Sequence, residues 1–298
     1  MSTITAKTSG RAAIATASRR SRRTLTMPQI VAVLVLIAIG SLFVIPFLWM
    51  LITSLKAQQD VFNPNWLPRP IRWANYPESL TALPFGRYLI NTAIITIASV
   101  LGSVFSSALV AYSFARLRWP GREFWFSVVL ATMILPGIVT LIPKYILFAK
   151  IGWVDTFLPL IVPTWLGGGA FYIFLLRQFF RGIPPELTEA ARIDGAGELR
   201  IWWQIFMPLC RPALAAITIF SFNGAWDDYL NPLIYLHSEK LYTLQLGLTA
   251  FKGGGGGVPQ WNLMMAASLV VLLPIILIFF FGQKYFIEGV SLSGLGGR

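Results

Sequence analysis

The sequence predicts an all-α integral membrane protein with six transmembrane helices. Of its 298 residues, 56% are hydrophobic and only 12% are charged, and the mean hydropathy is +0.67. Soluble domains carry about a quarter charged residues, so lipid must solvate much of this surface. Charge-free windows of about 20 residues, long enough to cross the hydrocarbon core as helices, recur along the chain.

Six charge-poor windows are the candidate spans. In chain order they cover residues 30–52, 88–114, 124–143, 156–176, 212–236 and 261–283. The fifth window is the least regular, because it contains two carboxylates, Asp227 and Asp228. Prolines inside the windows, such as Pro136 and Pro163, are tolerated in a membrane bundle because neighbouring helices satisfy the freed carbonyls.

The distribution of Lys and Arg predicts the orientation of these spans. Sixteen basic residues lie in the two tails, the second-to-third loop and the fourth-to-fifth loop, and eight lie in the remaining loops. This two-to-one bias places both termini in the cytoplasm. It also accounts for the net charge of +12 without a nucleic-acid partner, and leaves the lipid bilayer as the surrounding medium.

The ends of the chain are expected to be tails. Residues 1–27 are basic and rich in Ser, Thr, Ala and Arg, which favours disorder. Their Arg22-Arg23 pair resembles a twin-arginine signal, but the long apolar stretch that follows lacks a small-residue cleavage site, so we expect an uncleaved anchor. Residues 28–288 form the transmembrane domain, and residues 289–298 a cytoplasmic C-terminal tail.

The longest inner loop, residues 177–211, carries the signals of two short helices. Pro185 suits a helix start, and Glu189 in the next turn opposes the helix dipole. Gly195 suits the left-handed residue that ends a helix. We therefore expect one helix over residues 185–194 and a second over 198–206, which Pro208 stops. These residues alone are also compatible with an amphipathic loop lying on the membrane.

The same loop contains a spaced motif. Glu189-Ala190-Ala191 is followed by three residues and Gly195, and nine residues later by Ile205, Phe206, Met207 and Pro208. This pattern resembles the EAA loop of ABC importer permeases, which reads E-A-A, three residues, G, nine residues, I-x-L-P. Every defined position matches except the leucine, where this chain has Met207.

Other segments resemble the carbohydrate subfamily of these permeases, and most closely the shorter permease subunit of maltose-type transporters. They are residues 220–228, 241–248 and 283–290. Two features depart from the family pattern: Asp227 replaces the usual asparagine, and the chain ends in Gly-Gly-Arg rather than Lys-Gly. The resemblance covers nearly the whole chain and implies the type I ABC importer permease fold, in a bacterial cytoplasmic (inner) membrane.

The resemblance also implies a function and partners. The chain would be the permease subunit of an importer that moves a sugar or oligosaccharide into the cell. A second permease would complete a heterodimer, with two ABC ATPase subunits and an extracytoplasmic sugar-binding protein. No Walker A sequence occurs, so ATP and Mg would be held by the partner subunits; the chain would bind no cofactor directly and would not itself be an enzyme.

In this family the EAA helix docks into a cleft on the ATPase, and closure of the ATPase dimer changes which way the spans face. The residues of this sequence that would carry the ATPase coupling are Glu189, Ala190, Ala191, Asp194, Gly195, Ile205 and Pro208. The two alanines permit close backbone approach, and the glutamate can accept hydrogen bonds. The resemblance therefore places the energy-coupling surface on this loop.

Two segments are candidates for contact with the substrate or its binding protein. The polar residues of the fifth window would line the sugar path: Asn223, Trp226, Asp227, Asp228 and Asn231. Alternatively, they pair with the partner permease or cap a kink at Pro232. The glycine run would form a scoop that enters the sugar cleft of the binding protein, or is a slack linker: Gly253, Gly254, Gly255, Gly256 and Gly257.

Three alternatives remain. A related permease for a non-sugar solute has the same motif. A polytopic membrane enzyme has no support, because one cysteine and one histidine build no metal cluster and no nucleophile lies beside a base. A self-contained secondary carrier would usually show internal repeats, and none is found.

Overall fold

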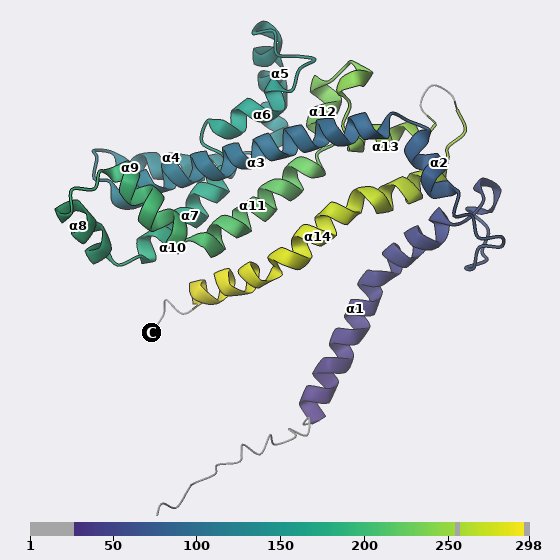
Figure 1. The fold of residues 1–298 in the computed structure, drawn as a ribbon, viewed down its shortest axis with the longest axis horizontal. Coiled ribbons are helices and arrows are strands. Elements are labelled where there is room, and N and C mark those ends of the chain that lie inside the picture. The colour runs from purple at the N-terminus through teal and green to yellow at the C-terminus, as the bar shows by residue number, and fades with distance from the viewer. Residues whose placement is uncertain (1–26, 254–256, 295–298) are drawn as a thin grey trace, which may run out of the picture. The chain divides into compact units, whose positions relative to one another are not determined.

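The computed structural model describes residues 27–253 and 257–294, with side chains as far as Gln283 (Figure 1). Every regular element in this part of the chain is a helix, which confirms the all-α fold class. The chain divides into two compact units, Met1–Leu48 and Trp49–Arg298. The tail predicted at 1–27, apart from Met27, and the last four residues of the C-terminal tail lie outside the described residues.

Four helical segments are long and apolar enough to cross a membrane. They are α1 (Met27–Ser54), α3 (Phe85–Arg116), the segment Leu158–Gly182 formed by α6 (Leu158–Trp165) and α7 (Ala170–Gly182), and Trp261–Gln283 within α14 (Trp261–Gly294). They correspond to the first, second, fourth and sixth predicted spans. Two further helix pairs pass the same test only as bent pairs, so the described residues contain four to six candidate spans.

The third predicted span is bent rather than straight. Helix α4 (Arg122–Thr132) and the segment Gly137–Lys150, made of η2 (Gly137–Thr140) and α5 (Leu141–Lys150), meet at 96°. Pro136 lies at the break with an extended backbone, ψ 132°. A proline disfavours helical backbone at the residue before it, which explains why the first segment ends there.

The fifth predicted span is not a single helix over residues 212–236. Helix α11 (Arg211–Trp226) ends before the two aspartates, and α12 (Leu230–Tyr235) begins after them. The backbone N–H of Asn231 donates to Asp228 Oδ1 at 3.2 Å, and the amide of Asn231 donates to Asp228 Oδ2 at 2.8 Å. An aspartate that bonds a nearby N–H in this way competes with helical pairing, so the carboxylates interrupt the helix. The bent pair that includes α11 is instead Glu198–Leu209 with Arg211–Trp226, at 83°.

Helix α3 is the centre of the larger unit. It packs against α6, α7 and α11, and α11 in turn packs against α14 (Figure 1). Small residues allow this close packing: a Cβ on Gly102 would lie 2.5 Å from the Trp165 ring, and Ser106 Oγ donates to the Thr164 carbonyl at 2.9 Å. Small residues and interhelical hydroxyl bonds are the usual means by which helices associate in lipid.

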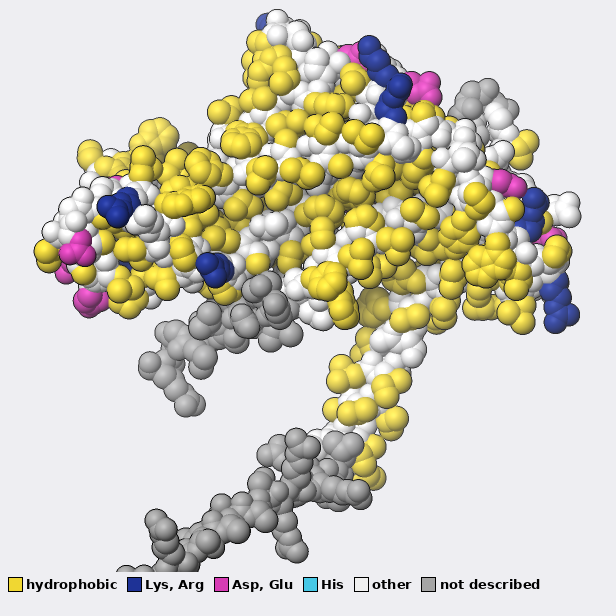
Figure 2. Space-filling model, in the orientation of Figure 1, with side chains coloured by type: hydrophobic (Ala, Val, Ile, Leu, Met, Phe, Trp, Pro, Cys, Tyr) yellow, Lys and Arg dark blue, Asp and Glu magenta, His cyan; other side chains and the backbone are white. Residues whose placement is uncertain are grey.

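Two aromatic cores stabilise opposite ends of α3. The cluster at its C-terminal end is built around Tyr112, Phe180 and Phe206, and the one at its N-terminal end around Tyr88 and Trp226. Figure 2 shows a broad hydrophobic face across the unit, with charged side chains mostly at its margins. Such a face is suited to contact with lipid or with another membrane subunit.

Short helices fill the connections. They are η1 (Gln58–Asp60), α2 (Asn75–Thr81), α8 (Pro185–Ile193), α9 (Glu198–Ile201), the π-helical turn η3 (Trp202–Phe206), α10 (Met207–Leu209), η4 (Glu239–Leu241) and α13 (Leu244–Ala250). In Figure 1, α8 lies at the end of the unit near the C-terminus of α3, whereas α2 and α13 lie near its N-terminus. The EAA loop, which contains α8, and the glycine run, which follows α13, are therefore at opposite ends of α3.

Candidate functional site

The EAA loop forms the helix that its sequence predicts. Helix α8 begins at Pro185 and ends at Ile193, one residue earlier than expected. Gly195 has a φ of +78°, its N–H donates to the Arg192 carbonyl at 3.0 Å, and the next N–H donates to the Ala191 carbonyl at 2.9 Å. These two bonds form a Schellman motif, whose left-handed position favours glycine. The glycine of the motif therefore fixes the turn from α8 into the next helix.

The outward surface of α8 is exposed. Glu189 and Ala190 are exposed, and the Glu189 carboxylate has no hydrogen-bond or ion-pair partner within the described residues. Ile193 is 86% exposed, and Leu199 in the following helix is 69% exposed. Exposed apolar side chains beside an unpaired carboxylate make a surface that is suited to binding another protein.

The second helix of the loop continues further than predicted. Helical backbone runs through α9, η3 and α10 as far as Leu209, so the prediction that Pro208 stops it was wrong. Pro208 follows the π-helical turn η3, in which the Met207 N–H donates to the Trp202 carbonyl, and α10 continues one residue beyond it. Phe206 is fully buried against Tyr112, with ring centroids 4.9 Å apart, so packing holds the segment in place. Ile205 is partly buried beside it.

Glu198 joins the EAA loop to α3. Tyr112 donates its hydroxyl to Glu198 Oε2 at 2.6 Å, and Arg192 of α8 donates to Glu198 Oε1 at 2.9 Å. One carboxylate thus receives a donor from a membrane helix and a donor from the exposed helix. This pair of bonds connects α8 to α3.

Arg116 fixes the base of the loop. Its guanidinium donates to the Phe180 carbonyl, through Nε at 3.0 Å and Nη2 at 2.5 Å, and to the Ile183 carbonyl, and lies 5.0 Å from the centroid of the Phe206 ring. The last carbonyls of α7 have no partner inside their own helix, so an arginine is well suited to bind them. Arg116 thereby connects the ends of α3 and α7 to η3.

Arg177 makes a similar connection between α7 and α4. It is 4% exposed, donates to both oxygens of Glu123 at 2.9 and 2.8 Å, and lies 3.8 Å from the centroid of the Phe126 ring. Sequence reasoning missed the roles of both arginines and counted them only as inner-loop charges. The signal available was their position at the ends of predicted spans.

A groove of about 890 Å³ runs beside α8. It is lined by Ala115, Arg116, Leu117, Arg118, Trp119, Arg122, Pro185, Thr188, Glu189, Arg192 and Glu198. The groove separates the turn after α3 from the exposed helix. Glu189 thus lies at the edge of a predominantly basic hollow, close to the surface that the EAA motif identifies.

A second, polar cavity of about 280 Å³ lies among the membrane helices. It is lined by Thr92, Ile95, Ser99, Ser103, Leu160, Thr164, Gly168, Tyr172, Ser221, Gly224, Ala225, Asp228, Asn231, Pro232 and Thr243. Seven of these carry hydroxyl groups, and none is basic. The Thr243 hydroxyl is buried and has no partner among the described residues. Hydroxyls, a carboxylate and an amide give this cavity both donors and acceptors.

The structure places two of the five candidate path residues at this cavity, Asp228 and Asn231. The Trp226 side chain lies instead in the aromatic core, where its indole N–H donates to the Val271 carbonyl at 3.0 Å. Asp227 is exposed and accepts a bond from Gln245 Nε2 at 2.7 Å. The Oδ1 atom of Asn223 is buried and has no partner within the described residues, and the residue does not line the cavity.

The hydroxyl residues of α3 were missed from the sequence. Thr92, Ser99 and Ser103 recur at intervals that put them on one side of a helix, in a window otherwise rich in isoleucine, leucine and valine. That spacing was visible, but nothing local showed which helices would face it.

The ends of the glycine run are close together. Gly253 has a φ of +86°, and the backbone N–H of Gln260 donates to the Phe251 carbonyl at 2.8 Å. The side-chain amide of Gln58 donates to the Pro259 carbonyl, which connects this loop to the segment between α1 and α2. Gly254, Gly255 and Gly256 lie outside the described residues, so the predicted scoop stays a prediction.

Comparison with known proteins agrees with this geometry. Residues 104–292 match the family model of the binding-protein-dependent transport system inner membrane component. The chain is 32% identical to the diacetylchitobiose uptake system permease protein NgcG of Streptomyces coelicolor, over 70% of this chain and 69% of that protein. It is 31% identical to the sn-glycerol-3-phosphate transport system permease protein UgpE of Yersinia enterocolitica, over 75% of this chain and 81% of that protein.

The fold is also similar to a solved structure. A chain of a bacterial ABC transporter involved in the import of the acidic polysaccharide alginate matches with a TM-score of 0.76 at 25% identity. The match covers 86% of this chain and 95% of that chain. The family match includes α8, the Schellman turn and most of the helices around the polar cavity.

Proposed function

Because this chain belongs to the family of binding-protein-dependent transport system inner membrane components, we propose that it is the permease subunit of an ABC importer that moves a sugar or oligosaccharide into the cell. The observation that carries the proposal is α8. It is an exposed helix with the full EAA spacing, ended by the left-handed Gly195 and joined to α3 through Glu198.

A neutral, hydroxyl-rich substrate fits the polar cavity. Its hydroxyl, amide and carboxylate groups can exchange hydrogen bonds with sugar hydroxyls, which both donate and accept. The name of NgcG gives a neutral disaccharide, whereas UgpE and the alginate importer are named for anionic solutes. The cavity lining includes Asp228 and has no lysine, arginine or histidine, which favours an uncharged solute over an anion.

The EAA loop would be the element that moves when the ATPase subunits bind and hydrolyse ATP. A separate ATPase subunit binds the exposed face of α8, with Glu189 as a hydrogen-bond acceptor and the small Ala190 and Ala191 permitting close approach. Movement of α8 passes to α3 through the bonds of Glu198 and Arg116. Because α3 lines the polar cavity, this movement changes access to the substrate path.

The remaining partners follow from the same assignment. A second permease covers part of the broad apolar face, two ATPase subunits hold ATP and Mg, and an extracytoplasmic sugar-binding protein delivers the substrate. The charge bias supports a cytoplasmic position for the EAA loop and both termini. The chain itself performs no ATP chemistry.

The test uses the whole transporter in proteoliposomes with two substitutions in the EAA loop. We expect Glu189→Lys and Gly195→Asp to leave insertion into the membrane unchanged, because both positions are exposed and a Cβ at Gly195 meets no atom within 4 Å. Both should abolish ATP-driven sugar uptake, because they alter the surface that binds the ATPase. Normal uptake by either variant would contradict the assignment of α8 as the docking helix.

A further inference from the structure

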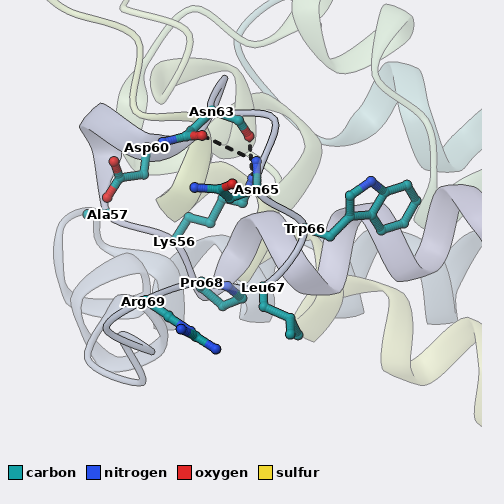
Figure 3. Close-up of a pocket in the computed structure, with 9 residues that line it drawn as sticks. All are labelled: Lys56, Ala57, Asp60, Asn63, Asn65, Trp66, Leu67, Pro68 and Arg69. Atoms are coloured by element: carbon teal, nitrogen blue, oxygen red, sulfur yellow. Dashed lines mark hydrogen bonds between the residues drawn. The ribbon is translucent and has the colours of Figure 1, made fainter.

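The connection between α1 and α2 contains a pocket of about 370 Å³. It is lined by Lys56, Ala57, Asp60, Asn63, Asn65, Trp66, Leu67, Pro68 and Arg69 (Figure 3). All of these residues belong to the larger unit, and the pocket lies at the end of α3 opposite α8. It is separate from the polar cavity, with which it shares no residue.

Hydrogen bonds to α2, α14 and the glycine loop hold this connection in place. Asn75 of α2 donates to the carbonyls of Ser54 and Lys56 at 2.7 and 2.8 Å, and Asn262 of α14 donates to Asn75 Oδ1 at 3.2 Å. The bond from Gln58 to the carbonyl of Pro259 connects the same segment to the glycine loop. The pocket is therefore a supported site beside the glycine loop.

The pocket has unused hydrogen-bonding capacity. Lys56 is 2% exposed, and its ammonium donates to the Asn63 carbonyl at 3.0 Å and lies 5.5 Å from the centroid of the Trp49 ring. An ammonium has three donors, so this leaves two to be satisfied. No carboxylate lies within ion-pair distance of it in the described part of the chain. A buried cation without a counter-ion is costly and suggests a ligand.

The other polar side chains of the pocket are also available. Those of Asp60, Asn65 and Arg69 make no hydrogen bond or ion pair within residues 27–253 and 257–283. Figure 3 shows Lys56, Asp60, Asn63 and Asn65 grouped together. The pocket therefore offers donors and acceptors side by side.

Trp66 also lines the pocket, and Figure 3 shows its indole directed away from Lys56, Asp60 and Asn65. Trp66 makes an edge-to-face contact with Trp49 at 6.1 Å and an interplanar angle of 87°, and remains 56% exposed. The T-shaped contact orients the ring without covering it. Polar groups on one side and an exposed aromatic ring on the other suit a flat molecule with polar edges and an apolar face.

This combination selects among possible ligands. A phosphate or a lipid headgroup phosphate only accepts hydrogen bonds, so it could bind Lys56 and Arg69 but would leave the Asp60 carboxylate and the amide oxygens without donors. A sugar hydroxyl both donates and accepts, so it satisfies the carboxylate, the amides and the ammonium together. The apolar C–H face of a sugar ring can also pack on an indole.

We propose that this pocket binds one ring of a neutral sugar at the entry end of the permease, beside the glycine loop. The proposal rests on the proposed function, since it assigns to this chain a contact with the transported sugar outside the membrane cavity. The Lys56 ammonium and the Asn65 amide bind ring hydroxyls, Asp60 accepts from them, and Trp66 supports the ring.

Protection of a single cysteine from alkylation tests the proposal. Cys210 is the only native cysteine and is 2% exposed, so Asn65→Cys introduces one reactive thiol into the pocket. Phe62→Cys is the matched control, because Phe62 is 81% exposed in the same connection and does not line the pocket. The whole transporter in phosphatidylcholine vesicles is labelled with a maleimide, with diacetylchitobiose, maltose or cellobiose as probe.

We expect the transported sugar to slow labelling of Asn65→Cys by about half at half-saturation, because only empty sites react, and to leave Phe62→Cys unchanged. Unchanged labelling of Asn65→Cys at concentrations that saturate uptake would overturn the proposal. Equal protection of both variants by sugar-free binding protein would identify a docking surface instead. A rate that responds to added phosphatidylglycerol, and not to sugar, would identify a lipid site.

The same vesicles separate this proposal from the proposed function. Uptake of each sugar by the wild-type transporter is measured alongside the labelling. ATP-driven uptake without protection contradicts only the pocket. Absence of ATP-driven uptake of any of the three sugars contradicts the assignment of the chain to a neutral-sugar importer.

Discussion

The turn after α8 gives a sharp test, because two nearby glycines differ in the sign of φ. Gly195 has a φ of +78°, whereas Gly197 has a φ of −72°. A Cβ added at either position meets no atom within 4 Å, so neither substitution to alanine creates a clash. Neither substitution acts through a clash, so a larger loss for Gly195→Ala than for Gly197→Ala, which changes the N-cap of α9, reports the left-handed backbone.

The expected magnitude follows from that conformation. A residue with a Cβ pays about 1 kcal/mol to adopt the left-handed region, which lowers the equilibrium constant for forming the native turn about fivefold. If ATPase docking requires this turn, Gly195→Ala lowers the rate of ATP-driven uptake about fivefold. Gly197→Ala leaves the rate unchanged, and Gly195→Asn restores most of it, because asparagine tolerates the left-handed region.

The assay is uptake by the purified transporter in proteoliposomes at equal amounts of inserted chain. Hydrogen exchange over residues 185–197 provides a second measurement, since a weakened turn exchanges faster. Equal uptake and equal exchange for Gly195→Ala and Gly197→Ala would refute the claim that the Schellman turn positions the docking helix.

Three further predictions concern the supports of the fold. Arg116→Lys should lower the free energy of unfolding by about 1–2 kcal/mol, seen in thermal denaturation, because lysine cannot bind the carbonyls at the end of α7 as a fork. Hydrogen bonds from Ser238 lower the pKa of Asp155 from 3.8 to about 2. The stabilisation of the folded state by these bonds is therefore complete above pH 3.8 and is lost as pH falls through 2. Asp155→Asn should remove this pH dependence of the free energy of unfolding. Gly102→Val should reduce the yield of folded protein, whereas Gly86→Val, with no atom within 4 Å, should be tolerated; equal yields would contradict the close packing of α3 on α6.

Local signals predicted the EAA helix well. Its start at Pro185 and the left-handed Gly195 depend on residues within one turn of the chain, so they can be seen in the sequence. Pro208 was misjudged for a related reason. A proline disfavours a helix without always ending it, and the packing of the buried Phe206 holds the segment helical through Pro208 to Leu209.

The polar cavity was harder to predict, because it is assembled by contacts distant in the chain. Asp228 and Asn231 stood out as polar residues in an apolar window, but so did Asp227, which the structure places outside the cavity. Thr92 and Ser103 are residue types common in membrane helices, and only the packing of the other helices against α3 shows that they line the cavity. The break between α11 and α12 also depends on the hydrogen bond from the Asn231 N–H to Asp228, which a hydropathy profile cannot predict.

The most direct test of the central claim is sugar uptake by the reconstituted transporter. Proteoliposomes contain this chain, its partner permease and the ATPase subunits, with the binding protein supplied on one side and ATP on the other. Uptake of a neutral oligosaccharide should require all of these components and should stop when α8 carries Glu189→Lys. Sugar uptake that continues without the ATPase subunits or without ATP would contradict the assignment of this chain as a permease driven through its EAA helix.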